Sequence, residues 1–357
     1  MLFYSAIFFI IAFLTFYEEG LKPNKRAATD ICMILVLGTV SAFHGIGGTD
    51  WDIYLAAYNR VPGIVDFIKT PLYYQSQIFY FEIGYLFIIS AFKTFGLNFH
   101  GYLFCQAIIF YCLIYKGLRR FTNHWGLVML VFIYKMFIYD TFVAMRQELT
   151  IAGFFILLPY LYERNAKKYF VGCILLTMIH MGAVILFCVY ILNYIKLTKR
   201  RLIILLSLFL PTVILAQMGL GGKLNTIMLL LNASKGESYS TSTESLSIAY
   251  TLEYYLLMGI IVINYNRIIL LKYAEFIIKL CLIMLPMVTL FSGVVILRRE
   301  MDYFFPLYGV LGGYLCNVKP NLKFLIILIY IIICYYGFQR YLHNFDYGGM
   351  LPYRSWL

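Results

Sequence analysis

The sequence is a succession of long apolar segments separated by short clusters of basic residues. Hydrophobic residues make up 62% of the 357 positions and charged residues only 13%, and the mean hydropathy is +0.81. Soluble domains usually carry about 25% charged residues, so this chain cannot cover itself with a solvated surface. The composition excludes a cytosolic globular enzyme, a disordered chain and a secreted disulfide scaffold. It predicts an all-α polytopic membrane protein with one integral domain over residues 1–357.

The basic clusters predict most of the topology. Placing all of them in the cytoplasm satisfies the positive-inside rule. Both chain ends then lie outside, and residues 44–78 and 218–247 form external loops. Since a span needs about 20 apolar residues, we expect about 10–12 transmembrane or re-entrant helices. The clusters are Lys22/Lys25/Arg26, Lys116/Arg119/Arg120, Arg164/Lys167/Lys168, Lys196/Lys199/Arg200/Arg201, Arg267/Lys272 and Lys319/Lys323.

Two segments do not fit as simple spans. Residues 169–195 have basic residues at both ends, so we predict a hairpin of two short halves that turns near His180. Residues 79–95 and 99–115 resemble two spans, although only an odd number of crossings can join an external residue 78 to an internal residue 116. The sequence favours a re-entrant or interfacial helix at 79–95, and the alternative is a misplaced basic cluster.

The cysteines and the net charge suggest neither a metal site nor a nucleic-acid partner. All eight cysteines lie in apolar runs, with no CxxC pair and no Cys/His cluster, and we interpret them as small buried apolar residues. The sequence contains no dense carboxylate cluster, so we expect neither a metal nor a cofactor. The net charge of +12 comes from clusters between apolar segments, which set orientation in a membrane.

Polar side chains gather at the external ends of the predicted spans, which predicts a site there. An ionisable residue in lipid is costly and usually faces a cavity. Guanidinium groups pair bidentately with phosphate oxygens, and histidine or carboxylate groups can act as bases. Each residue also has a structural alternative, namely headgroup anchoring, an interior histidine or an external turn. The set comprises His44, Asp50, Asp52, Glu82, Arg146, Gln147, Glu148, His180, Arg298, Arg299 and Asp302.

Four motifs resemble the EpsG-like branch of Wzy-type polysaccharide polymerases, in order and spacing over about residues 29–310. The first is Gly48-Thr49-Asp50-Trp51 with Tyr54, and the second is Glu82 with Gly84 and Tyr85. The third is Arg146-Gln147 followed by His180. The fourth runs from Arg298 to Tyr303.

The resemblance implies a metal-independent glycosyltransferase with a GT-C-like architecture. Such an enzyme moves a growing glycan from polyprenyl pyrophosphate to a lipid-linked repeat unit, at the periplasmic face of the bacterial inner membrane. Its partners would be undecaprenyl-pyrophosphate-linked oligosaccharide, membrane lipids and, although no residue identifies it, a chain-length regulator. Neither the sugars nor the product (O antigen, the polymer of lipopolysaccharide, or capsule or exopolysaccharide) can be derived from the residues.

Carried over by position, the resemblance also implies residue roles. The catalytic candidates are His180 as base, with Asp50 and Glu82 as sugar-binding or supporting carboxylates. Arg146 and Arg298 or Arg299 would hold pyrophosphate. Gln147, Tyr54 and His44 complete the predicted substrate-binding set. His44 departs from the family, which often has arginine four residues before the first motif's glycine, and it could serve as a cation or an alternative base.

Other functions stay open from the sequence. Asp50 and Asp52 could be the paired acids of a metal-dependent glycosyltransferase that uses polyprenyl-phosphate sugars. An O-antigen ligase shares the donor chemistry but usually has a larger late external loop than 218–247. A lipid-linked sugar transporter would need polar groups at mid-membrane depth, and a membrane O-acetyltransferase would place its histidine toward the cytoplasm.

Overall fold

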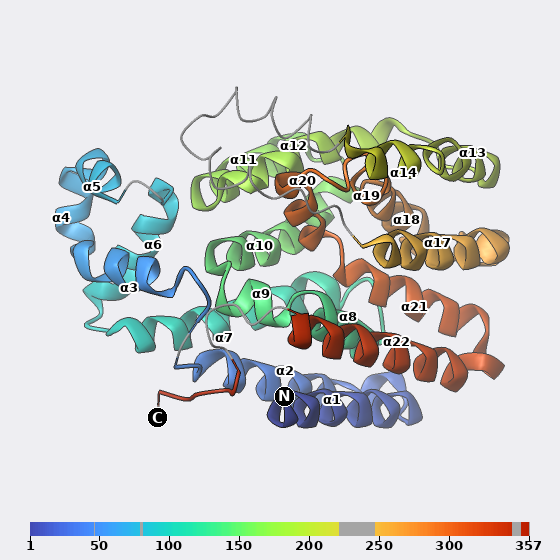
Figure 1. Ribbon diagram of the computed structural model, residues 1–357, viewed down its shortest axis with the longest axis horizontal. Coiled ribbons are helices and arrows are strands. Elements are labelled where there is room, and N and C mark those ends of the chain that lie inside the picture. The colour runs from blue at the N-terminus through green and yellow to red at the C-terminus, as the bar shows by residue number, and fades with distance from the viewer. Residues whose placement is uncertain (46, 79–80, 221–246, 345–350, 357) are drawn as a thin grey trace. The chain divides into compact units, whose positions relative to one another are not determined.

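The computed structural model describes residues 1–357 except 46, 79–80, 221–246, 345–350 and 357 (Figure 1). All regular elements within these ranges are helices, apart from one isolated bridge between His44 and Ser355, so the all-α prediction is confirmed. Most of the predicted loop 218–247 lies outside the described residues. The chain forms two compact units, residues 1–190 with 324–357 and residues 191–323. The expectation of a single integral domain stays a prediction.

The first unit contains long helices and a group of short ones. The long helices are α1 (Leu2–Gly20), α2 (Ala27–Ala42), α7 (Phe99–Leu118), α10 (Met145–Tyr162), α11 (Ala166–Ile179) and α22 (Lys323–Asn344). The short ones are η1 (Pro23–Lys25), α3 (Trp51–Arg60), α4 (Ile64–Lys69), α5 (Pro71–Gln77), α6 (Ile83–Thr94), α8 (Trp125–Lys135), α9 (Phe137–Phe142), η2 (Met181–Val184) and α12 (Ile185–Val189), and η3 (Tyr190–Tyr194) leads into the second unit.

In the second unit, α17 and α18 both pack against α21. Tyr254 of α17 donates a hydrogen bond to the carbonyl of Cys281 in α18 at 3.2 Å. The predicted span 274–296 is interrupted, because α19 ends at Val288 and a new helix begins at residue 295. The elements are α13 (Lys199–Phe209), α14 (Thr212–Leu215), η4 (Ala216–Leu220), α17 (Ile248–Ile268), α18 (Ala274–Leu282), α19 (Met284–Val288), α20 (Val295–Arg299), η5 (Glu300–Tyr303), α21 (Pro306–Val318) and η6 (Pro320–Leu322).

Among the described residues, five helical stretches are long and apolar enough to cross a membrane: Leu2–Gly20, Phe99–Leu118, Lys199–Met218, Ile248–Ile268 and Pro320–Asn344. Several shorter apolar helices accompany them. Many apolar side chains also lie on the surface of the chain, among them Leu35 and Leu208. Such a surface suits lipid rather than water, and the chain is a multi-pass membrane protein. Cys32, Cys112 and Cys188 are exposed, so our expectation that all the cysteines are buried was wrong for these three.

The segment 169–195 is a hairpin, as predicted. Helix α11 ends at Ile179, and His180 has an extended backbone (φ −150°, ψ 122°). The chain then returns along α11, because Tyr169 donates to the Leu186 carbonyl at 2.7 Å and Tyr190 donates to the Arg164 carbonyl at 2.9 Å. Fourteen residues of α-helix rise only about 21 Å, less than a hydrocarbon core of about 30 Å.

Helix α6 belongs to a group of short helices rather than to a complete span. Its twelve residues rise about 18 Å, and it turns at Gly96 (φ 74°) into α7. The Lys93 ammonium donates to three carbonyls at the end of α3, those of Tyr58, Asn59 and Val61, at 2.6 to 2.9 Å. Figure 1 shows α3–α6 grouped at the end of the first unit where α7 begins. For the described residues 81–95, this arrangement supports the interfacial interpretation of the segment 79–95.

Buried ion pairs hold the opposite end of α7 and the start of α8. Arg26 donates to both carboxylate oxygens of Glu19 at 3.1 Å and to the Asn123 carbonyl at 2.8 Å. Glu18 accepts hydrogen bonds from the backbone N–H groups of Trp125 and Gly126 at 3.0 and 2.7 Å. These contacts satisfy donors that a helix start leaves unpaired. They also bring the predicted clusters 22–26 and 116–120 to one end.

Close helix contacts in the first unit depend on glycine. A Cβ atom on Gly117 of α7 would lie 2.6 Å from the Cβ of Phe155 in α10, and one on Gly84 of α6 would lie 2.7 Å from the Met178 carbonyl oxygen of α11. Small residues allow helix backbones to approach in a membrane. Helices α6, α7, α10 and α11 can therefore converge.

The buried ion pair makes a prediction about stability. Replacing Arg26 with alanine leaves Glu19 without its bidentate partner at a site where the two side chains are 6% and 0% exposed. Breaking a buried pair costs about 3–5 kcal/mol, so we expect a clearly lower thermal unfolding midpoint in detergent. Lys25→Ala, at an exposed neighbour, is the control and should change little. Equal midpoints for both variants would contradict this account.

Candidate functional site

Arg146 lies at the centre of a polar cluster in the first unit. It occupies the first turn of α10, and its Nη1 donates to Glu82 Oε2 at 2.6 Å. Its Nε donates to the Tyr54 hydroxyl at 3.4 Å, and its guanidinium lies 4.5 Å from the centre of the Phe81 ring. The cluster therefore joins α10 to α3 and to the residues that precede α6.

Glu82 connects this arginine to the hairpin. Its second oxygen, Oε1, accepts a hydrogen bond from the Met181 backbone N–H at 3.0 Å and lies 3.7 Å from His180 Nδ1. The Arg146, Glu82 and His180 side chains are 17%, 13% and 17% exposed. A ligand can thus reach three polar groups, which come from the first turn of α10, the residue before α6 and the residue after α11.

Tyr54 provides a neutral partner for Arg146. Burial raises the pKa of its hydroxyl, while the positive charge of Arg146 opposes that shift. Tyr54 therefore keeps its proton at neutral pH, and its oxygen accepts a hydrogen bond from the arginine.

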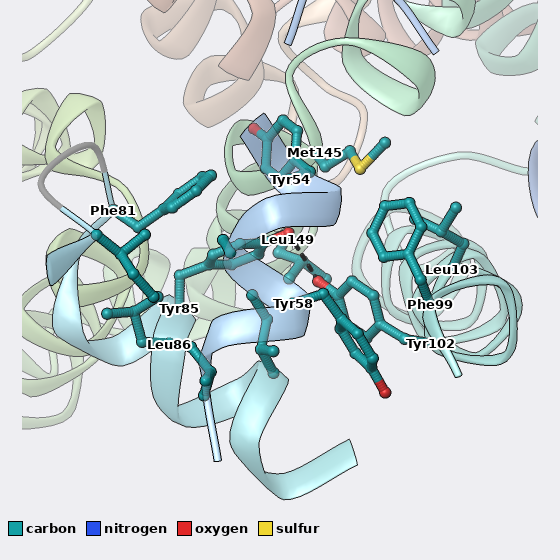
Figure 2. Packing of buried hydrophobic residues seen from close by; sticks show 14 of the residues in the cluster. Tyr54, Tyr58, Phe81, Tyr85, Leu86, Phe99, Tyr102, Leu103, Met145 and Leu149 are labelled. Atoms are coloured by element: carbon teal, nitrogen blue, oxygen red, sulfur yellow. Dashed lines mark hydrogen bonds between the residues drawn. The ribbon is translucent and has the colours of Figure 1, made fainter. Parts of the chain in front are cut away.

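A buried aromatic core packs against the polar cluster. Figure 2 shows Tyr54, Tyr58, Phe81, Tyr85 and Tyr102 packed against one another, with Met145 and Leu149 of α10 beside them. The Tyr85 and Tyr102 hydroxyls form a hydrogen bond of 2.8 Å with each other, the dashed line in the figure. This core fixes α3, α6 and α7 around the start of α10.

Gln106 of α7 continues that support and was missed by the sequence analysis. The hydroxyl of Tyr102 donates to its carbonyl oxygen, and its amide donates to the Met145 carbonyl at 3.0 Å and to Glu148 Oε2 at 2.9 Å. Gln106 and Glu148 are 3% and 2% exposed. Gln106 therefore binds the first turn of α10 through contacts inside the protein. A lone glutamine in an apolar run carries no sequence signal of this role.

The Gly-Thr-Asp motif lies against the end of α9. The Gly48 N–H donates to the Phe142 carbonyl at 3.4 Å, and a Cβ on Gly47 would lie 2.6 Å from that same oxygen. Asp50 precedes α3 and sits one helical turn before Tyr54, a spacing that places both on one helix face. The motif thus comes to the Arg146 end of the unit. Asp52 is exposed.

The part of the chain that the structure describes contains no group of three or more His, Cys, Asp or Glu residues able to hold a metal ion.

His44 is buried, and its backbone forms an isolated bridge with Ser355. It is 2% exposed, its Nδ1 contacts the Ser41 carbonyl oxygen, and its ring stacks on Phe142 with centroids 4.5 Å apart. The adjacent Gly45 N–H donates to the Arg354 carbonyl at 2.7 Å. Burial lowers the pKa of His44 to about 4, so the ring is uncharged at neutral pH. This placement gives no support to a role as a phosphate-binding cation.

The remaining predicted site residues are Gln147, Arg298 and Arg299. Gln147 is 1% exposed, and it follows Arg146 on the protein side of α10. Arg298 and Arg299 are half-buried in α20 of the second unit, so their convergence with Arg146 stays a prediction. Next to them, burial raises the pKa of Glu300 to about 7, although the Arg299 charge opposes the shift.

The state of His44 makes a prediction about pH. A histidine with a folded pKa near 4 and an ordinary value of 6.5 contributes stability above about pH 6.5, which is lost as the pH falls toward 4. We expect acidification to about pH 4.5 to cost about 2–3 kcal/mol through this residue. The measurement is the thermal unfolding midpoint of the wild type and of His44→Phe, at neutral pH and at about pH 4.5. The variant should lose less, and an identical acid response in both proteins would refute the prediction.

Comparison with known proteins adds one finding. A model of the EpsG family matches residues 27–355, nearly the whole chain, and this range includes Tyr54, Glu82, Arg146 and His180. No curated protein and no solved structure matches. The GT-C-like architecture therefore stays a prediction. The chain belongs to the EpsG family, a Wzy-like polymerase-type family, which ties it to polysaccharide polymerisation in a membrane.

Proposed function

We propose that the protein is a polysaccharide polymerase that transfers a growing glycan from polyprenyl pyrophosphate to a lipid-linked repeat unit. The observation that carries this proposal is the partly exposed Arg146–Glu82 pair, which lies at the start of α10 beside His180. The family match supports the same class of reaction. The substrate would be an undecaprenyl-pyrophosphate-linked oligosaccharide, and the site would face the periplasm from the inner membrane.

The proposed role of Arg146 follows from charge and geometry. A guanidinium group binds phosphate oxygens bidentately, and the first turn of a helix adds a partial positive charge and unpaired N–H groups. Glu82, Tyr54 and the Phe81 ring already fix the orientation of the guanidinium. A fixed cation needs little rearrangement when charge develops on a leaving group.

In the proposed step, an acceptor sugar hydroxyl attacks the anomeric carbon of the growing glycan. The bond from that carbon to the phosphate oxygen breaks, and polyprenyl pyrophosphate leaves with the electron pair. The hydroxyl proton passes to a base, for which we propose His180. Glu82 already binds Arg146 and the Met181 N–H, so it acts as a supporting carboxylate, and Asp50 remains a proposed sugar ligand.

The orientation that we propose rests on the basic residues. Arg26 and Arg119 lie at the end of the first unit where α8 begins, whereas Arg146 begins α10. The last residue of α10, Tyr162, lies about 24 Å farther along the helix axis than Arg146. Tyr162 is followed by the basic cluster Arg164/Lys167/Lys168, which marks that end as cytoplasmic. On the positive-inside rule, we propose that Arg146 faces the periplasm.

The first test replaces Arg146. Arg146→Ala should abolish long glycan chains on a gel from cells lacking the native gene, with unchanged membrane level of the protein. Arg146→Lys should reduce polymerisation about 10- to 100-fold, because it loses charged hydrogen bonds of about 1.5–3 kcal/mol. Arg60→Ala, at an exposed arginine of α3, should behave as wild type. Long chains made by Arg146→Ala would remove Arg146 from the site.

The second test concerns His180. We expect a large loss of polymerisation for His180→Ala and a smaller loss for His180→Gln if the ring acts by hydrogen bonding, since the amide keeps a donor and an acceptor. A base requires more than that, so equal and severe losses in both variants indicate proton transfer. Wild-type glycan profiles from both variants would make the residue structural.

A further inference from the structure

An apolar groove of about 400 Å³ lies between three segments of the first unit. Ile68 comes from α4, Phe87 from α6, and Leu175 and Met178 from α11. Gly84 also lines the groove, where the backbone of α6 lies close to Met178 of α11. Two of its walls therefore belong to α6, which follows Glu82, and to α11, which precedes His180.

The groove begins at the polar cluster. Ile83 and Ile179 both line it, and they are the chain neighbours of Glu82 and His180. Consecutive Cα atoms lie about 3.8 Å apart, so the apolar walls start next to the residues that surround Arg146. The Met181 N–H bond to Glu82 at 3.0 Å fixes the spacing of the two walls at this end.

The other side of the groove opens to the surroundings of the chain. The side chains of Ile68 and Leu175 are 60% and 57% exposed, although both are apolar. A surface of this kind marks contact with lipid or with a hydrophobic ligand. An amphiphile could lie with its chain along the groove and its headgroup at the cluster.

We propose that this groove binds the isoprenoid chain of the lipid-linked donor, in the units that follow the pyrophosphate. This inference rests on the proposed function. The positive charge of Arg146 at one end and the apolar walls beyond Ile83 complement one molecule that joins an anionic head to a hydrocarbon chain. Of the lipids around the protein, the donor is the one that must place its phosphates at Arg146.

The test fills the groove without touching the polar cluster. Leu175→Trp places a large side chain at a groove-lining position, and Ile174→Trp is its matched control, because Ile174 lies one residue away on α11, is 51% exposed and does not line the groove. With purified full-length protein in nanodiscs, we expect Leu175→Trp to raise the KM for the lipid-linked donor about tenfold, which corresponds to about 1.4 kcal/mol of binding free energy. The control should keep the wild-type KM. Equal KM values in the two variants would overturn the proposal.

A second pair of variants and a binding measurement test the proposal independently. Ile68→Trp and its control Val65→Trp repeat the comparison on α4, where both native side chains are more than half exposed. A polyprenyl pyrophosphate with a photoreactive group in its first isoprene units should label α4, α6 or α11 in the wild type and label Leu175→Trp much less. Labelling confined to other helices, or equal labelling by a photoreactive phospholipid, would overturn the groove assignment.

The two proposals fail in different ways. If the wild type makes no polymer from the donor, the proposed function is wrong, whatever the label does. If the wild type polymerises and the groove variants match their controls, only the groove assignment is wrong.

Discussion

One carboxylate determines how the candidate site is assembled. Glu82 holds the Arg146 guanidinium with one oxygen and the Met181 N–H with the other, at 2.6 and 3.0 Å. It thereby ties the start of α6 to the start of α10 and to the turn after α11. Because Gly84 lets α6 approach Met178, the same helix crossing supplies both the polar cluster and one wall of the groove. The site depends on this junction more than on any single ligand-binding group.

Much of this arrangement could be predicted from the sequence, because charges are costly in lipid and their positions are informative. The hairpin at His180 followed from basic residues at both ends of a short apolar segment. Glu82, Arg146 and His180 were predicted to converge since each lies at an external end, and the structure brings these three together. Asp50 and Tyr54 came to the same region through the loop motif.

Other features depend on packing that no local pattern records. The loop 44–78 contains α3, α4 and α5, whose six to ten residues are too short for a periodic signal. Gln106 acts through contacts with residues about forty positions away. His44 is neutral because its ring is buried, with Phe142 stacked on it, and a contact between residues so distant in the chain leaves no mark in either segment.

Two of the carboxylate–arginine pairs of the first unit, Glu19–Arg26 and Glu82–Arg146, show why exposure decides their roles. Glu19 and Arg26 are almost fully buried, so separating them would leave a charge in a dry interior. Glu82 and Arg146 have a comparably short contact but remain 13% and 17% exposed. An incoming anion can reach the Arg146 guanidinium, and solvent can reach the Glu82 carboxylate when the arginine binds that anion instead. The buried Glu19–Arg26 pair therefore stabilises the helix junction near the start of α8. The Glu82–Arg146 pair, in contrast, is suited to exchange its partner for a ligand.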